Sequence, residues 1–126
     1  MNNLAYAKNS YVSTGKEGRV MGASGHQLIT ILLEELLNLL DETCLILTQE
    51  RQQSVTDQQV MALTIVDSLL VSLDMEKGGE LAKNLQLIYG QVRKLIESDD
   101  PANQLKNTRT AHVIMSEISS AWTAIG

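Results

Sequence analysis

The sequence predicts an all-α protein, an antiparallel up-and-down four-helix bundle that follows a mobile N-terminal arm. Three observations predict this fold. Apolar residues recur at the spacing of a helix in four segments. The connections between the segments are short, as antiparallel neighbours in a bundle require. The chain contains a single Pro, which favours helices, and its strand signals are weak.

The 126 residues fit one domain, preceded by a segment of different composition. Residues 1–25 are rich in small polar residues, and four glycines fall within eleven positions of each other: Gly15, Gly18, Gly22 and Gly25. We interpret residues 1–25 as a flexible arm that docks weakly through its few apolar side chains. Residues 26–126 are expected to form the bundle.

The first helix is expected over about residues 26–51, with Ser24 as its cap. A surface helix needs an apolar stripe of roughly 100°. The apolar positions of this segment cover well over half of the circumference, which suggests more apolar surface than one core absorbs. They are Leu28, Ile29, Ile31, Leu32, Leu33, Leu36, Leu37, Leu39, Leu40, Leu45, Ile46 and Leu47.

Capping and turn signals place the other helices. Thr56 with Gln59 has the pattern of a capping box, which begins a second helix that ends near residue 73. The third helix follows Gly79 and ends near residue 98, with an apolar repeat at Leu81, Leu85, Ile88, Val92 and Leu95. Gly90 inside it costs about 1 kcal/mol relative to Ala, which we explain by a close helix crossing.

The fourth helix is expected to begin at Asp100-Pro101, because Asp supplies an acceptor at the cap and Pro suits the first helical position. Its apolar stripe continues almost to the end of the chain: Ala111, Ile114, Ile118, Ala121, Trp122 and Ile125. Trp122 is expected to anchor the core.

Charge and composition exclude several classes of protein. The net charge of −5 disfavours binding to nucleic acid and to acidic membrane surfaces. The most hydrophobic stretch, residues 28–47, carries four acidic residues, so we expect no membrane insertion. The lone Cys44 forms no internal disulfide, and no secretory signal is visible at Met1, so we expect a cytoplasmic protein.

Residues with catalytic or metal-binding chemistry are scattered. No Glu is followed by His three positions later, and His26 and His112 lie far apart, so no metal or cofactor is expected. Gly78-Gly79 lacks the pattern of a phosphate-binding loop, and Cys44 is expected to be a buried small apolar residue. We therefore expect no enzyme. The spare apolar surface favours a protein partner instead.

One stretch carries a family resemblance. It runs Ser72-Leu73-Asp74-Met75-Glu76-Lys77-Gly78-Gly79-Glu80-Leu81-Ala82-Lys83-Asn84-Leu85, followed by Ile88-Tyr89. It resembles the signature of the flagellar secretion chaperones that bind flagellin. Arg93 with Leu95-Ile96-Glu97, the arm residues Tyr11 and Val20 to Ser24, and the closing Ile118 and Trp122 also match that family's pattern. Gly25 and Leu33-Glu34-Glu35 depart from it, where the family has Pro and Tyr-Asp-Gly.

The resemblance implies an antiparallel bundle in the cytosol that binds the disordered C-terminal segment of flagellin. The bound segment cannot polymerise early, and the complex docks at the flagellar export gate. In some members the arm covers part of the groove. Partner contacts are expected at Tyr11, Val20, Met21, Leu28, Leu32, Met61 and Tyr89. Structural roles are expected for Gly78 and Gly79 at close helix ends, for Asn84 as a buried hydrogen-bonding residue and for Trp122.

Two alternatives follow from the same apolar surface. The protein could be a structural bundle whose spare surface is a homodimer interface, or a chaperone for a different secreted cargo. A tight dimer that ignores a flagellin peptide would favour the first alternative. The departures on helix one would favour the second.

Overall fold

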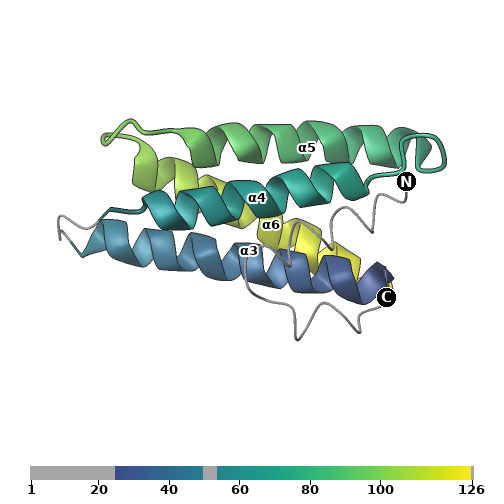
Figure 1. Cartoon of the computed structure of the whole chain (residues 1–126), viewed down its shortest axis with the longest axis horizontal. Coiled ribbons are helices and arrows are strands. Elements are labelled where there is room, and N and C mark those ends of the chain that lie inside the picture. The colour runs from purple at the N-terminus through teal and green to yellow at the C-terminus, as the bar shows by residue number, and fades with distance from the viewer. Residues whose placement is uncertain (1–24, 50–53, 126) are drawn as a thin grey trace.

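The computed structural model of the chain describes residues 25–49 and 54–125, and in these ranges it consists of helices and their connections (Figure 1). The helices are α3 (Gly25–Thr48), α4 (Thr56–Ser72), α5 (Gly79–Glu97) and α6 (Gln104–Ile125). They run alternately up and down, and α6 returns to pack against α3. The all-α four-helix bundle is confirmed. The expected Ser24 cap and residues 50–51 of helix one lie outside the described residues.

The core is almost entirely aliphatic, as the scarcity of aromatic residues requires. Tyr89 is the one aromatic residue within its buried cluster, and Trp122 packs partly buried against it. The largest fully buried side chains are Leu32, Leu33, Leu36, Leu40, Ile65, Leu69, Met115, Val66 and Val92. Met115 lies at the centre of the core although the expected α6 stripe omits it. At the other end of that stripe, Ala121 is exposed and Ile125 is 73% exposed.

The apolar excess expected on helix one is largely absorbed by the bundle. α3 packs against both α4 and α6, so its two flanks are covered as well as its inner face. Ten of its residues are buried, and Leu45 is its only exposed large apolar side chain among the described residues. The 100° stripe applies to a helix with one covered face, which α3 is not. None of the described helices is both long and apolar enough to cross a bilayer.

The capping box expected at the start of α4 is wrong. No side chain caps Val55, the residue that precedes the helix, and the Ser54 hydroxyl accepts a hydrogen bond from the Thr56 backbone N–H at 3.1 Å. The Gln59 amide instead reaches across the bundle and donates to the Ile96 carbonyl at 3.1 Å. Gln59 therefore satisfies a carbonyl in the last turn of α5 rather than a donor of its own helix.

The start of α6 lies three residues later than Asp100-Pro101 indicates. Asp100 does act as an acceptor, because its carboxylate receives the Ala102 backbone N–H at 3.1 Å and the Asn103 side-chain amide at 2.7 Å. Residues 101–103 form a turn, and the regular helix begins at Gln104. The capping chemistry is as expected, and one tight turn separates it from the helix.

The close helix crossing expected at Gly90 is absent. A Cβ built on Gly90 meets no other heavy atom within 4 Å, apart from its own helix and chain neighbours. No neighbouring helix therefore requires glycine at this position. Its cost in helix propensity has no compensating contact in the described structure.

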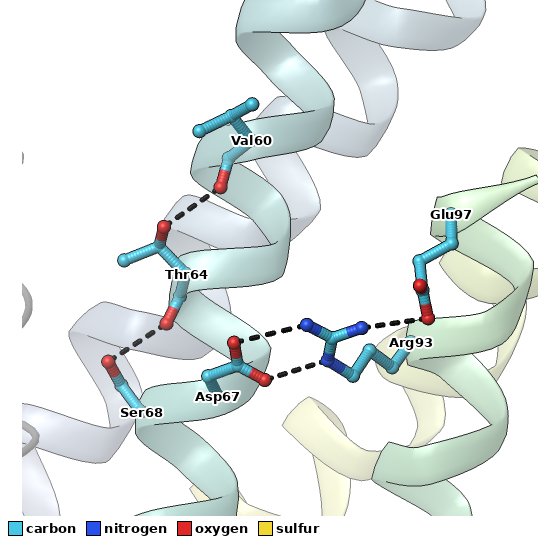
Figure 2. Close-up of polar contacts among 6 residues, drawn as sticks. All are labelled: Val60, Thr64, Asp67, Ser68, Arg93 and Glu97. Atoms are coloured by element: carbon cyan, nitrogen blue, oxygen red, sulfur yellow. Dashed lines mark hydrogen bonds and ion pairs between the residues drawn. The ribbon is translucent and has the colours of Figure 1, made fainter.

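An ion-pair network joins α4 to α5 on the surface (Figure 2). The Arg93 guanidinium donates to the Asp67 carboxylate at 2.8 Å and pairs with Glu97 at 2.8 Å. Hydrogen bonds to Asp67 and then Glu97 raise the pKa of Arg93. Exposed pairs contribute at most about 1 kcal/mol each, so the network orients the two helices more than it stabilises them.

Candidate functional site

The α4–α5 connection, the beginning of α3 and the end of α6 lie at the same end of the bundle (Figure 1). Residues from these segments line an apolar pocket. Its volume is about 520 Å³, within the roughly 300–1,000 Å³ of pockets that bind small ligands. It is lined by Gly25, His26, Ile29, Ser72, Leu73, Asp74, Lys77, Gly78, Leu81, Ala82, Leu85, Tyr89 and Trp122. We call it the signature pocket, because residues of the Ser72–Leu85 motif form much of its wall.

The α4–α5 connection is shaped by one aspartate. The Asp74 carboxylate accepts the backbone N–H groups of Glu76 at 3.1 Å and Lys77 at 2.9 Å. The Asp74 carbonyl accepts the Gly78 N–H at 2.7 Å, which closes the turn. Short polar side chains favour such turns because they bond backbone groups two and three residues on.

The two glycines after this turn are required for different reasons. A Cβ on Gly78 would lie 2.6 Å from the Ala82 Cβ and 2.7 Å from the Asp74 carbonyl oxygen. Gly79 has space around it but a φ of +54°, where side chains are disfavoured. The expected role of permitting close helix ends is thus wrong for Gly79, whose need is conformational. Gly78 permits a close approach within its own turn.

One face of α5 forms the long wall of the pocket. Leu81, Leu85 and Tyr89 follow one another at intervals of four residues. Leu81 is 65% exposed although it belongs to the apolar repeat of this helix. Tyr89 is only 4% exposed, and burial raises the pKa of its phenol to about 12. The face therefore runs from an exposed leucine to a buried tyrosine.

His26 and Trp122 close the opposite side. Their rings stack with centroids 4.6 Å apart and planes 7° from parallel. The Trp122 indole N–H donates to the His26 carbonyl at 3.2 Å, and His26 Nε2 donates to the Trp122 carbonyl at 3.0 Å. A carbonyl only accepts, so Nε2 carries the proton. This reciprocal pair ties the first turn of α3 to the last turn of α6.

The expected partner contacts do not form one surface. Tyr89 lines the signature pocket, whereas Leu28 and Leu32 are 2% and 0% exposed and belong to the core. A partner reaches these two leucines only after the side chains that cover them move. Met61 is partly buried against the core, away from the pocket lining. The other expected contacts, Tyr11, Val20 and Met21, lie outside the described residues.

Of the residues with expected structural roles, some lie where expected and others do not. Trp122 and Gly78 line the signature pocket, and Trp122 packs against the core as expected. Asn84 is exposed, so its expected role as a buried hydrogen-bonding residue is wrong. It falls on the outer side of α5 because Ala82, Leu85 and Tyr89 turn towards the bundle. Cys44 is only partly buried, and desolvation raises the pKa of its thiol.

Several pocket residues were absent from the expected site. The sequence places Leu81 and Leu85 in the apolar repeat of the third helix and shows no metal-ligand spacing at His26. The repeat of Leu81, Leu85 and Tyr89 beside a tight turn was the available signal. Nothing in the local sequence connects His26 to Trp122, 96 residues away.

The arrangement supports binding of an apolar group. Among the described residues, no group of three or more His, Cys, Asp or Glu side chains could hold a metal ion. The His112 ring lies 2.8 Å from the Asp41 carboxylate, and the pair links α6 to α3 on the surface, outside the pocket lining. The pocket itself offers aliphatic walls with a few polar groups, as binding sites for apolar ligands do.

Comparison with known proteins agrees with the resemblance carried by residues 72–85. The chain matches the family model described as Flagellar protein FliS over residues 7–126. The flagellar secretion chaperone FliS of Escherichia coli is 32% identical over 120 residues, which cover 94% of this chain and 88% of the relative. The FliS of Salmonella typhimurium is 32% identical over 118 residues, which cover 92% and 87%. The flagellar secretion chaperone FliSB of Pseudomonas aeruginosa is 28% identical over 123 residues, which cover 94% of each chain. This chain therefore belongs to the FliS family of flagellar secretion chaperones.

Proposed function

We propose that this protein is a cytoplasmic, non-enzymatic export chaperone for flagellin. It binds the disordered C-terminal segment of flagellin, prevents premature polymerisation and delivers the subunit to the flagellar export gate. The observation that carries the proposal is the signature pocket, an accessible apolar site formed largely by the residues of the family motif.

The energetics of binding a disordered segment favour such a site. Ordering the segment costs several kcal/mol, which burial of apolar surface must offset. Leu81, which lines the pocket and is 65% exposed, supplies such surface outside the core. A cargo that covers this leucine removes apolar area from water without disturbing the bundle.

The arm, residues 1–25, is proposed to take part in cargo binding. Tyr11, Val20 and Met21 are its proposed contacts, and Tyr11 is the clearest, because a Tyr in a polar, Gly-rich segment has little structural reason to be there. Tyr11→Ala is expected to weaken cargo binding and leave the melting temperature unchanged. A loss of stability as large as that of a core truncation would make Tyr11 structural instead.

The proposal is tested by isothermal titration calorimetry of the full chain with a peptide of the flagellin C-terminal segment. Binding at micromolar affinity or tighter is expected. The matched control is flagellin truncated before that segment, which should not bind. A folded protein that fails to bind the peptide contradicts the proposal.

Two alternatives are separated by further measurements. A homodimer would use exposed apolar residues on different helices, Leu45, Val60 and Val113. Light scattering with and without the peptide distinguishes a constitutive dimer from a cargo-binding protein. Binding to another secreted substrate in place of flagellin, measured in the same calorimeter, would indicate a different cargo.

A further inference from the structure

The outward face of α5 carries a narrow stripe of residues that the bundle does not use. Its members follow one another at intervals of four, three and four positions: Lys83, Leu87, Gly90 and Lys94. At about 100° per residue they fall within an arc of about 60°, on the side away from the buried Tyr89, Val92 and Ile96. We call this stripe the outer seam. None of its residues lines the signature pocket.

Gly90 is the unusual member of the outer seam. It lies in the interior of α5, where glycine is the least favourable residue after proline. A Cβ at this position meets no heavy atom of another element within 4 Å, so no described neighbour needs the space. Glycine otherwise serves where something must approach the backbone closely. The notch at Gly90 faces outward and is therefore available to a second molecule.

Leu87 lies one turn before Gly90 and is 69% exposed. Water gains no hydrogen bond from this side chain, so its apolar area is free to be covered. A protruding leucine thus lies beside a notch on the same face of the helix. The spacing of four, three and four residues is that at which two helices pack side by side, each inserting side chains between those of the other. The relief of the outer seam therefore suits another helix.

The two ends of the outer seam are positively charged. Lys83 and Lys94 are both exposed, and Lys94 takes no part in the ion pairs of the described residues. Lys83 lies 3.6 Å from Glu80, but these side chains are 64% and 85% exposed, so water screens the pair. Glu97, the acidic residue nearest to Lys94 in the sequence, is paired with Arg93 at 2.8 Å. The two lysines therefore favour a partner with carboxylates at the matching positions.

A second copy of this chain does not complement the outer seam. Two copies of α5 packed antiparallel would place Leu87 of each against Gly90 of the other, which suits the sizes of these residues. The same register places Lys83 against Lys94 of the other copy at both ends, and like charges in contact are unfavourable. A parallel pair sets each lysine against its own equivalent. The charges therefore favour a different chain.

We propose that the outer seam binds an amphipathic helix of another protein. This helix carries a large aliphatic side chain that fills the notch at Gly90, a small residue opposite Leu87, and a carboxylate opposite each lysine. The partner helix binds away from the signature pocket, so it does not compete with the cargo. The inference does not depend on flagellin being that cargo.

The test is a calorimetric titration of the full chain with a synthetic helical peptide. The seam positions of this acidic probe, spaced by four, three and four residues, carry Glu, Leu, Ala and Glu, which matches α5 in antiparallel orientation. The control peptide carries Lys in place of both Glu residues. We expect the acidic probe to bind, more weakly as the ionic strength rises, and the basic peptide not to bind.

Gly90→Ala separates binding from stability. Filling the notch should weaken binding of the acidic probe at least about fivefold. The same variant should have a raised melting temperature, a combination that a merely structural glycine does not produce. Leu87→Gln should weaken binding about tenfold. The matched control Leu45→Gln alters a leucine of 59% exposure on α3 and should change the affinity less than about twofold.

Failure of the acidic probe to bind overturns the proposal, as does equal binding of the acidic and basic peptides. An unchanged affinity of Gly90→Ala overturns the notch as the point of contact. Light scattering that shows a dimer abolished by Leu87→Gln identifies a second copy as the occupant and overturns a different chain.

The flagellin peptide separates this inference from the proposed function. Displacement of the acidic probe by the flagellin peptide places the cargo in the outer seam and overturns a separate partner. We expect Leu87→Gln to bind the flagellin peptide as the unmodified protein does. Failure of the unmodified protein to bind that peptide contradicts the proposed function and leaves the result with the acidic probe unaffected.

Discussion

Replacing glycine by alanine should stabilise the protein at Gly90 and destabilise it at Gly79 and Gly78, although all three lie in α5 or in the turn before it. Gly90 lies in the interior of α5, where a Cβ meets nothing within 4 Å. Gly79 begins the helix with a φ of +54°. Gly78 has a φ of −78° and a ψ of −17°, which any residue adopts, but a Cβ there collides with Ala82 and the Asp74 carbonyl.

The magnitudes follow from these three geometries. Gly90→Ala should raise the free energy of unfolding by about 1 kcal/mol, the difference in helix propensity. Gly79→Ala should lower it by about 1 kcal/mol, because a left-handed conformation costs an L-residue roughly 1–2 kcal/mol. Gly78→Ala should lower it by about 2–3 kcal/mol, since neither colliding atom lies at the end of a flexible side chain and the turn itself must shift.

Thermal unfolding followed by circular dichroism at 222 nm measures all three variants. For a domain of this size, 1 kcal/mol corresponds to roughly 3–5 °C in Tm. The expected order is therefore Gly90→Ala above the unmodified protein, then Gly79→Ala, then Gly78→Ala. A lower Tm for Gly90→Ala would refute the absence of a close contact there. A neutral Gly78→Ala would refute the collision within the turn.

Three further predictions concern single side chains. Trp122→Phe keeps a ring against His26 but removes the donor to the His26 carbonyl, so it should cost about 1–2 kcal/mol in urea unfolding. An unchanged unfolding midpoint would contradict this. The pKa of Tyr89 is raised to about 12, above the ordinary value of about 10, so its neutral form stabilises the fold. That contribution, at most about 3 kcal/mol, is fully present below pH 10 and is lost as the pH rises to 12; Tyr89→Phe should therefore lose less stability over that interval. Burial raises the pKa of the Cys44 thiol, so it should react with a disulfide reagent at pH 7.5 more slowly than a cysteine peptide, and urea should abolish the difference.

Much of the fold follows from local patterns. The four helices are found within a few residues of their expected ends, because apolar spacing and the scarcity of Pro are properties of short segments. The motif from Ser72 to Leu85 is a local pattern and indicates the family without tertiary information. The Asp74 turn and the two glycines after it were also visible as a connection. Why each position needs glycine is visible only in the tertiary structure: a Cβ would collide at Gly78, and Gly79 has a positive φ.

The candidate site depended far more on the tertiary structure. Periodicity shows that α3 has a wide apolar surface, but only its position between α4 and α6 shows that the bundle absorbs it. The same periodicity places Leu81 on one face with Leu85 and Tyr89, although Leu81 lines the open pocket and is 65% exposed. Gln59 bonds to Ile96 and His26 to Trp122 across distances in sequence that no local rule can bridge.

The sequence by itself therefore determined the helices, the aliphatic core and the family, since each depends on residue type and short-range spacing. Only the tertiary structure decided which apolar residues remain accessible and where they meet. Accessibility depends on which flank of each helix faces a neighbour, and that is set by packing between segments distant in the chain. The signature pocket, with Leu81 at its exposed end and Tyr89 at its buried end, is a consequence of that packing.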